Sequence, residues 1–336
     1  MDATAAVPEV RAAAWSALGT GVRIVVHGTA LDAARGVVEE LLDRVDRTYS
    51  RFRPDSELVA LNARAGETVA ASPLLLDAIE IALWAARDTN GAVDPTVGRA
   101  MRAIGYDIDF RQLPADAGSL EIRLEPIPGW QSVELSRTRG TVRLAPGVEL
   151  DLGSTGKAWA ADLAAAAVAA DARARRGGAS RAGRASADDR PVGVLVSLGG
   201  DIATTGTPPD GGWRILIAED SETPLDALGE TVAIAGGAIA TSSTTVRRWR
   251  RGETAIHHLV DPRTGAPASS PWRTVTVAAP SCVLANTVAT DAITGGSAGF
   301  ERLLASGRPA RLVATEGTIH RLNGWPDPAA VVEPLA

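Results

Sequence analysis

The chain has 336 residues, 45% of them hydrophobic and 22% charged, which is typical of a soluble globular protein. Its net charge of −6 and isoelectric point near 5.4 exclude an overall basic surface of the kind that binds nucleic acid or anionic lipid. The single cysteine, Cys282, excludes an internal disulfide.

Nothing in the sequence indicates insertion into a membrane. No apolar stretch approaches the roughly 18 residues of a transmembrane helix. The first residues, MDATAAVPEV, lack the uninterrupted apolar region of a signal peptide. We therefore expect a cytoplasmic protein, or an extracytoplasmic one if the start site is misassigned.

The first hundred residues predict a tail, a strand and two helices. Residues 1–12 are expected to be a mobile tail, followed by a strand over 23–27. Apolar residues recur at helical spacing over 31–52, which indicates an amphipathic helix. A second helix is predicted over 72–88, because a Ser-Pro pair suits its first turn and an Asn-Gly pair follows its end.

The remainder mixes short strands with helices. Residues 132–136 and 141–144 are typical of a hairpin, and the alanine-dense stretch 156–170 predicts a helix. Residues 171–191 are rich in Arg, Ala, Ser and Gly without apolar periodicity, which favours a flexible, solvated insertion over a basic surface for an acidic partner. Further strands are predicted over 192–197, 213–218, 231–234, 257–260, 274–279 and 310–315, and helices over 282–294 and 298–305.

These elements do not alternate regularly as βαβ units. The sequence therefore predicts an α+β fold with mixed, largely antiparallel sheets and packed helices, in one domain over 13–330.

One lysine stands out from the basic residues. Of the 34 lysines and arginines only Lys157 is a lysine, and it lies in the segment DLGSTGKAWAAD. An ammonium is a compact point charge suited to a single phosphate oxygen, although an arginine-biased composition can also leave one lysine by chance. The segment is not a P-loop, but a glycine turn before a helix directs backbone N–H groups at an anion.

Three other segments combine glycine turns with small polar and acidic residues. They are G-A-V-D-P-T-V-G at 91–98, S-L-G-G-D-I at 197–202, and T-S-S at 241–243 followed by H-H-L-V-D-P-R-T-G at 257–265. Each alone is also explained by a structural turn.

Taken together and in order, these segments resemble the ApbE family of flavin transferases over roughly residues 15–325. The Lys157 segment resembles that family's D-L-G-G-x-A-K-G-Y-A-x-D. The other similarities are 197–202 to N-x-G-G-D-I, 240–242 to A-T-S-G, 258–265 to H-I-I-D-P-R-T-G, 275–290 to V-T-V…A-D-A-x-x-T, 49–57 to S-x-F…S-E, and 91–96 to G-A-F-D-P-T.

The resemblance implies an ApbE-like, T-fold-like architecture and a magnesium-dependent reaction on FAD. A hydroxyl of a client protein with a Ser/Thr flavinylation motif attacks the phosphorus on the FMN side, and AMP leaves. Matched by position, the implied FAD-binding residues are Ala92, Val93, Asp94, Asp151, Lys157, Thr241 and Leu259. The implied metal ligands are Ser154, Asn286 and Thr290.

The resemblance also implies catalytic roles for Lys157, at the phosphates, and for His258. A histidine titrates near working pH and can take the client's proton, or it can hydrogen-bond FAD or hold the turn that follows. The neighbouring His257 is expected to be structural or exposed, and Trp159 to pack in the core.

Two departures from the family pattern leave alternatives open. Asn286 stands where the family has aspartate, and 243–244 read Ser-Thr instead of Gly-Asp. Asp291 is not an obvious substitute, because on a helix it points away from Asn286. The alternatives are an FAD-binding protein or FAD pyrophosphatase, and a flavoprotein scaffold that has lost catalysis. The basic run 247–251 is expected to hold phosphates or a client, or to be a solvated strand end.

Overall fold

The computed structural model describes residues 10–107, 127–181, 192–251 and 253–326, and its centre is an eight-stranded sheet. The strands, in spatial order, are β1 (Val10–Ala17), β2 (Thr20–His27), β6 (Gly193–Leu198), β7 (Asp201–Gly206), β10 (Ala238–Ser243), β13 (Trp272–Ala279), β14 (Ala310–Ala314) and β15 (Ile319–Leu322). Every neighbouring pair is antiparallel, which confirms the predicted fold class. Strands from both ends of the described chain share this sheet.

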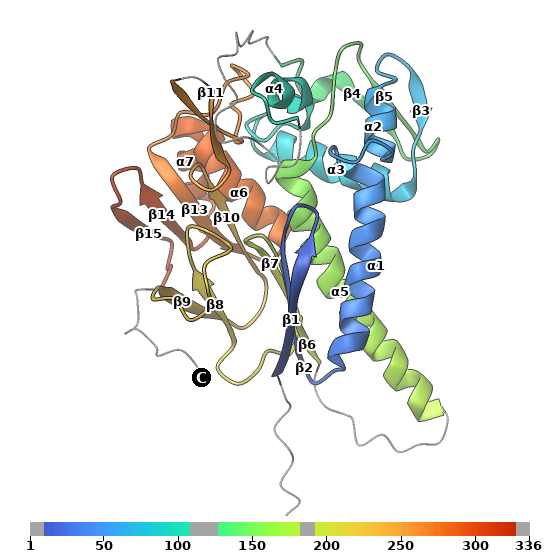
Figure 1. Ribbon diagram of the computed structural model, residues 1–336, viewed down its shortest axis with the longest axis vertical. Coiled ribbons are helices and arrows are strands. Elements are labelled where there is room, and N and C mark those ends of the chain that lie inside the picture. Colours follow the sequence, from blue (N-terminus) through green and yellow to red (C-terminus); the bar gives the residue numbers. More distant parts are fainter. Residues whose placement is uncertain (1–9, 108–126, 182–191, 252, 327–336) are drawn as a thin grey trace, which may run out of the picture.

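Helices cover one face of the sheet. The helices are α1 (Leu31–Tyr49), α2 (Glu57–Asn62), α3 (Pro73–Asp88), α4 (Gly98–Ala103), α5 (Gly153–Arg181), α6 (Cys282–Thr294) and α7 (Gly296–Ala305), with short 3₁₀ turns η1 (Pro95–Val97) and η3 (Trp130–Ser132). Helices α5 and α6 pack directly on the sheet, and α1 packs on α5 (Figure 1). Small side chains such as Ala161 and Ala164 let α5 approach the sheet closely. Within the described residues, no helix has both the length and the apolarity to cross a membrane.

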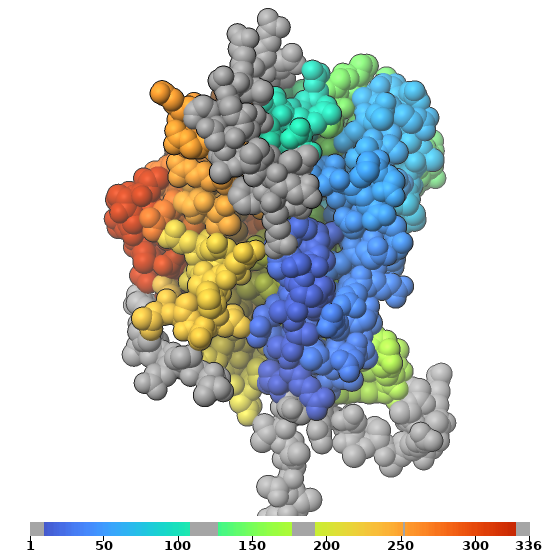
Figure 2. Space-filling model, viewed as in Figure 1, coloured from blue at the N-terminus to red at the C-terminus, as the bar shows by residue number. Residues whose placement is uncertain are grey.

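The opposite face of the sheet is covered by a hairpin of β8 (Trp213–Ile217) and β9 (Glu230–Ile234). Alternation along β6 distributes its side chains between the two layers. Val194 and Val196 lie in the core beneath the helices, whereas Leu195 packs with Trp213 under the hairpin. Figure 2 shows residues of this region (yellow) beside the β1–β2 hairpin (blue) on one surface of the molecule.

Two small sheets flank the main one. Strands β3 (Thr68–Ala70), β5 (Thr141–Leu144) and β4 (Val133–Ser136) form a three-stranded sheet in that order, and β4 with β5 is the predicted hairpin. Strands β11 (Arg248–Arg251) and β12 (Thr254–His257) form a two-stranded sheet.

The expected tail and the expected loop both overlap regular secondary structure. Residues 10–12 of the expected tail lie in β1, paired with β2. As an edge strand with mostly exposed side chains, β1 needs no apolar alternation, so the sequence gives no signal for it. The expected loop at 171–191 is helical as far as Arg181, because Ala and Arg favour helix and Asp171 pairs with Arg175 one turn later. Residues 1–9 and 182–191 lie outside the described part.

Other predicted elements differ in extent. The strand expected over 257–260 ends at His257, because the backbone N–H of Leu259 turns back to donate to the His257 ring. Helix α1 ends at Tyr49, because Ser50 is extended, and the chain beyond it brings Arg51 to Asp151 before the start of α5. The elements not predicted from sequence are α2, α4, β1, β3, β7, β10, β11 and β15.

Candidate active site

A cavity of about 1050 Å³ lies between the β1–β2 hairpin, the start of α5, the β8–β9 hairpin and the chain after β12. It is lined by segments from most of the chain. Every residue proposed from the sequence for cofactor, metal or catalysis lines it: Ala92, Val93, Asp94, Asp151, Ser154, Lys157, Thr241, His258, Leu259, Asn286 and Thr290. The structure therefore brings the whole predicted set into one site.

Asp151 organises the start of α5. Its Oδ1 accepts a hydrogen bond from the backbone N–H of Gly153 at 2.7 Å, and its Oδ2 forms an ion pair with Nε of Arg51 at 2.7 Å. Arg51 is in turn stacked between the rings of Phe52 and Tyr106, with its guanidinium carbon 4.0 and 4.3 Å from the ring centroids. This buried carboxylate thus joins the first turn of α5 to the chain leaving α1.

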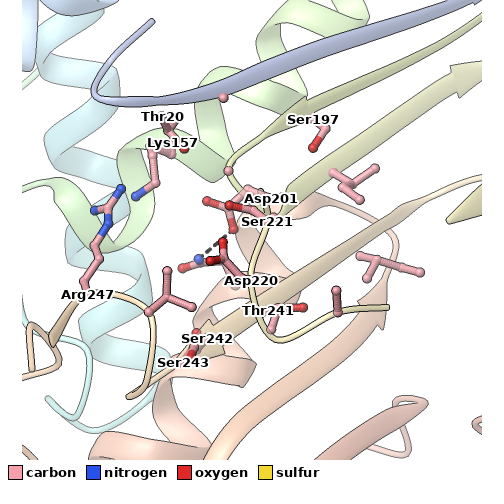
Figure 3. A pocket seen from close by; sticks show the side chains of 18 of the residues that line it. Thr20, Lys157, Ser197, Asp201, Asp220, Ser221, Thr241, Ser242, Ser243 and Arg247 are labelled. Carbon is pink, nitrogen blue, oxygen red and sulfur yellow. Dashed lines mark hydrogen bonds between the residues drawn. The ribbon is translucent and has the colours of Figure 1, made fainter. Parts of the chain in front are cut away.

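The next turn of α5 presents Lys157 to the cavity (Figure 3). Its Nζ donates to the carbonyl of Gly153 at 3.2 Å, so the ammonium folds back over the helix start. Burial, and secondarily the positive charge of Arg247, lower the pKa of Lys157 to about 8, against the opposing effect of Asp201. Lys157 and Arg247 therefore place two positive charges on the same side of the cavity.

Behind this turn, Tyr49 packs against the helix backbone. Its hydroxyl donates to the carbonyl of Gly156 at 3.0 Å, and its ring stacks on Trp159 with centroids 5.9 Å apart. A Cβ on Gly156 would lie 2.9 Å from Cε2 of the Tyr49 ring, so only glycine allows this approach. Trp159 is buried, as expected for a core residue.

Asp94 fixes the loop that carries Ala92 and Val93. Its Oδ1 accepts hydrogen bonds from the backbone N–H (2.8 Å) and the hydroxyl (2.6 Å) of Thr96, and its Oδ2 accepts one from the backbone N–H of Trp130 at 2.9 Å. The loop is also tied to α6, since the hydroxyl of Thr294 donates to the carbonyl of Ala92 at 2.8 Å. Both oxygens of Asp94 thus hold the loop in shape.

A glycine turn between β6 and β7 places Asp201 in the cavity. Gly199 has φ +61°, and a Cβ there would lie 2.0 Å from the hydroxyl oxygen of Thr20, so the turn requires glycine. Asp201 begins β7 and is buried. Burial raises the pKa of Asp201, while the nearby positive charge of Lys157 acts in the opposite direction.

One face of α6 meets Asp201 from the other side. Asn286 and Thr290 are one helical turn apart and both line the cavity. Nδ2 of Asn286 donates to Oδ1 of Asp201 at 3.0 Å, the bond dashed in Figure 3, and the hydroxyls of Thr290 and Ser242 are 2.8 Å apart. Oδ1 of Asn286 is buried and has no hydrogen-bond partner among the described residues.

These groups suit a hard divalent cation. Amide, hydroxyl and carboxylate oxygens are the ligands that Mg²⁺ prefers, and an unpartnered buried amide oxygen is a free ligand position. Among the described residues no group of three or more His, Cys, Asp and Glu side chains is placed to hold a metal, so carboxylates are scarce here. Asp291 is no substitute, because Arg302 binds both of its oxygens at 2.6 and 2.8 Å.

His258 and its neighbour have different surroundings. Burial, together with Arg247 and Lys157, holds the pKa of His258 well below its usual value, so its ring is neutral at neutral pH. Its Nδ1 is buried without a hydrogen-bond partner among the described residues. His257 holds the turn, since its Nδ1 accepts from the backbone N–H of Leu259 at 3.3 Å and its Nε2 donates to the carbonyl of Ala268 at 3.1 Å.

Arg51 and Asp201 line the cavity although the sequence predicts no role for them. Arg247 belongs to the basic run 247–251, for which the sequence predicts contacts with phosphates or a client, or a solvated strand end. Arg247 lines the cavity and donates to the Tyr106 hydroxyl at 3.2 Å, whereas Arg248–Arg251 form β11. Arg51 and Asp201 both lie in segments that resemble the family motifs. Arg51 could have been found as an arginine beside an aromatic residue, and Asp201 as an acid directly after Gly-Gly.

Comparison with known proteins first defines the class of fold. A crystal structure of the ApbE protein from Thermotoga maritima superimposes with a TM-score of 0.75 at 23% identity, covering 94% of this chain and 97% of that one. A flavinyl transferase ApbE from Pseudomonas stutzeri gives a TM-score of 0.73 at 21% identity, covering 96% and 97%. The chain therefore has the fold of these proteins.

Sequence similarity makes the assignment more specific. The model of the ApbE family matches residues 18–176 and 172–313. A protein from Chlamydia trachomatis named FAD:protein FMN transferase is 30% identical over 278 residues, which are 79% of this chain and 78% of that protein. This chain belongs to the ApbE family.

Proposed function

We propose that this protein is a magnesium-dependent transferase that moves FMN from FAD to a serine or threonine hydroxyl of a client protein and releases AMP. The observation that carries the proposal is the convergence of every motif-derived residue on one cavity of about 1050 Å³. Small-molecule sites have volumes of about 300–1,000 Å³, so this cavity suits a large dinucleotide. The names of the curated relatives support the same activity.

The cations and the helix start suit the pyrophosphate of FAD. Lys157 and Arg247 supply positive charge, and the first turn of α5 supplies backbone N–H groups and the positive end of its dipole. Asp94 and Asp151 act mainly through the backbone segments that they fix, because both oxygens of each are already engaged within the protein.

Transfer is a substitution at phosphorus. The client hydroxyl oxygen forms a bond to the phosphorus on the FMN side, and the bond from that phosphorus to the AMP oxygen breaks, so AMP leaves with the electron pair. The neutral ring of His258 accepts the hydroxyl proton at its unpartnered Nδ1. When bound, Mg²⁺ neutralises charge on the phosphate oxygens, and Ser154, Asn286 and Thr290 are the residues proposed to hold it.

The decisive experiment combines the purified protein, FAD, Mg²⁺ and a client segment bearing a Ser/Thr flavinylation motif. The expected result is a fluorescent client band on a denaturing gel and one AMP released per label. A client whose acceptor hydroxyl is replaced by alanine is the matched control.

Two results would contradict the proposal. Release of FMN and AMP without labelled client would identify an FAD pyrophosphatase. The missing carboxylate at Asn286 favours this function and the scaffold alike. Binding of FAD without either product would identify a flavoprotein scaffold.

A further inference from the structure

Position 286 carries an amide in this chain, and the cation site lacks one unit of negative charge as a result. A neutral amide oxygen attracts Mg²⁺ less strongly than a carboxylate oxygen does. Asp291, the nearest acid along α6, is held by Arg302 and does not line the cavity. The missing charge must therefore come from another element if the site holds a cation.

We propose that Asp201, at the start of β7, supplies the carboxylate ligand of the divalent cation in this chain and compensates for Asn286. The inference rests on the proposed magnesium dependence. The negative charge that position 286 of helix α6 lacks would then come from strand β7.

The hydrogen bond between the two residues sets the orientation of both. Nδ2 of Asn286 donates to Oδ1 of Asp201 at 3.0 Å, so the amide nitrogen is committed to the carboxylate. Oδ1 of Asn286 is therefore the amide atom left to bind a cation, and it is buried without a partner among the described residues. The bond also holds the carboxylate beside that oxygen.

Asp201 differs from the other buried acids around the cavity in having coordination capacity to spare. Asp94 accepts hydrogen bonds at both carboxylate oxygens. Asp151 accepts one at Oδ1, and its Oδ2 is in an ion pair with Arg51. Within the described residues, the bond from Asn286 is the only hydrogen bond that the Asp201 carboxylate accepts. A carboxylate has about four acceptor positions, so Oδ2 in particular is left for a ligand. A buried carboxylate in the cavity wall is unfavourable without compensating positive charge. Lys157 lies near enough to act on Asp201, but no ion pair to the Asp201 carboxylate forms among the described residues.

The test measures Mn²⁺ binding to the full chain by the electron paramagnetic resonance signal of free Mn²⁺, alone and with FAD. In Asp201→Asn the new amide oxygen can still accept from Asn286, so the internal bond is kept and only the charge is lost. We expect at least about tenfold weaker Mn²⁺ binding in this variant. Asp210→Asn removes an equal charge from an exposed residue that lines the same cavity. The Mn²⁺ affinity of this control variant should equal that of the wild type.

A double variant that moves the carboxylate from position 201 to position 286 separates loss of the ligand from a folding defect in a single variant. Asn286→Asp alone should tighten Mn²⁺ binding, and Asp201→Asn combined with Asn286→Asp should recover wild-type affinity. Wild-type affinity in Asp201→Asn, or a double variant as weak as Asp201→Asn, would overturn the inference. Failure of the proposed function is distinct, because the wild-type protein would then label no client while still binding Mn²⁺. A wild-type protein that binds no Mn²⁺ would overturn the inference itself.

Discussion

Asp162 on α5 caps the first turn of α6: its Oδ1 accepts a hydrogen bond from the backbone N–H of Cys282 at 2.9 Å. Its Oδ2 accepts a second from the backbone N–H of Val283 at 3.0 Å. A helix start has unpaired N–H groups that a carboxylate satisfies. The two helices that carry Lys157 and Asn286 are therefore joined directly, and the distance across the site depends on this contact.

Asp162→Ala should lower the free energy of unfolding by about 1–3 kcal/mol, since it removes two hydrogen bonds to a half-buried carboxylate. Urea denaturation followed by circular dichroism measures the change. Asp171→Ala on the same helix is the control, because it removes only the surface pair with Arg175, worth about 0.3–0.5 kcal/mol. Equal destabilisation by both changes would refute the capping role.

Gly156→Ala should destabilise the protein and weaken FAD binding. The new methyl group would lie 2.9 Å from the buried Tyr49 ring, which must shift together with the turn that carries Lys157. We expect a loss of about 1–3 kcal/mol. Gly36→Ala on α1 is the matched control: its Cβ meets nothing within 4 Å, so the higher helix propensity of alanine should stabilise by up to about 1 kcal/mol. The prediction fails if both variants gain stability.

FAD affinity should fall as pH rises through 8. The pKa of Lys157 is lowered to about 8, chiefly by burial. The side chain therefore carries a positive charge below that pH and loses its proton and charge above it. Apparent affinity should then decline by up to about tenfold per pH unit at the steepest. Quenching of FAD fluorescence between pH 7 and pH 9.5 measures it. Lys157→Met should bind weakly at every pH; the same decline in that variant would assign the titration to another group.

His258→Ala should reduce FMN transfer by at least about 100-fold while FAD binding remains, because a general base contributes about that much. The pKa of His258 is held well below 6.5, so the wild-type kcat/KM for the client should stay level down to pH 6.5. It should fall at lower pH, as protonation removes the base. His320→Ala, at an exposed histidine packed on Trp272, should transfer normally. Unchanged turnover in His258→Ala would leave His258 without a role in proton transfer.

The sequence by itself determined the residue types and their order along the chain. The Ser-Pro start and the Asn-Gly end placed α3, because such capping signals are local, and α6 has its predicted bounds. The motif segments resemble those of the ApbE family in order and spacing, and this resemblance implied the cofactor and metal residues that line the cavity.

Only the tertiary structure decided which side chains meet. Strand β10 carries mostly small residues and owes its strand conformation to pairing with β7 and β13, which no local pattern indicates. Asp201 and Asn286 are 85 positions apart, yet a hydrogen bond joins them. Periodicity reports which face of an element is buried, whereas the partner on that face depends on how the sheet and helices pack. For this reason the carboxylate beside Asn286 became visible only in the folded chain.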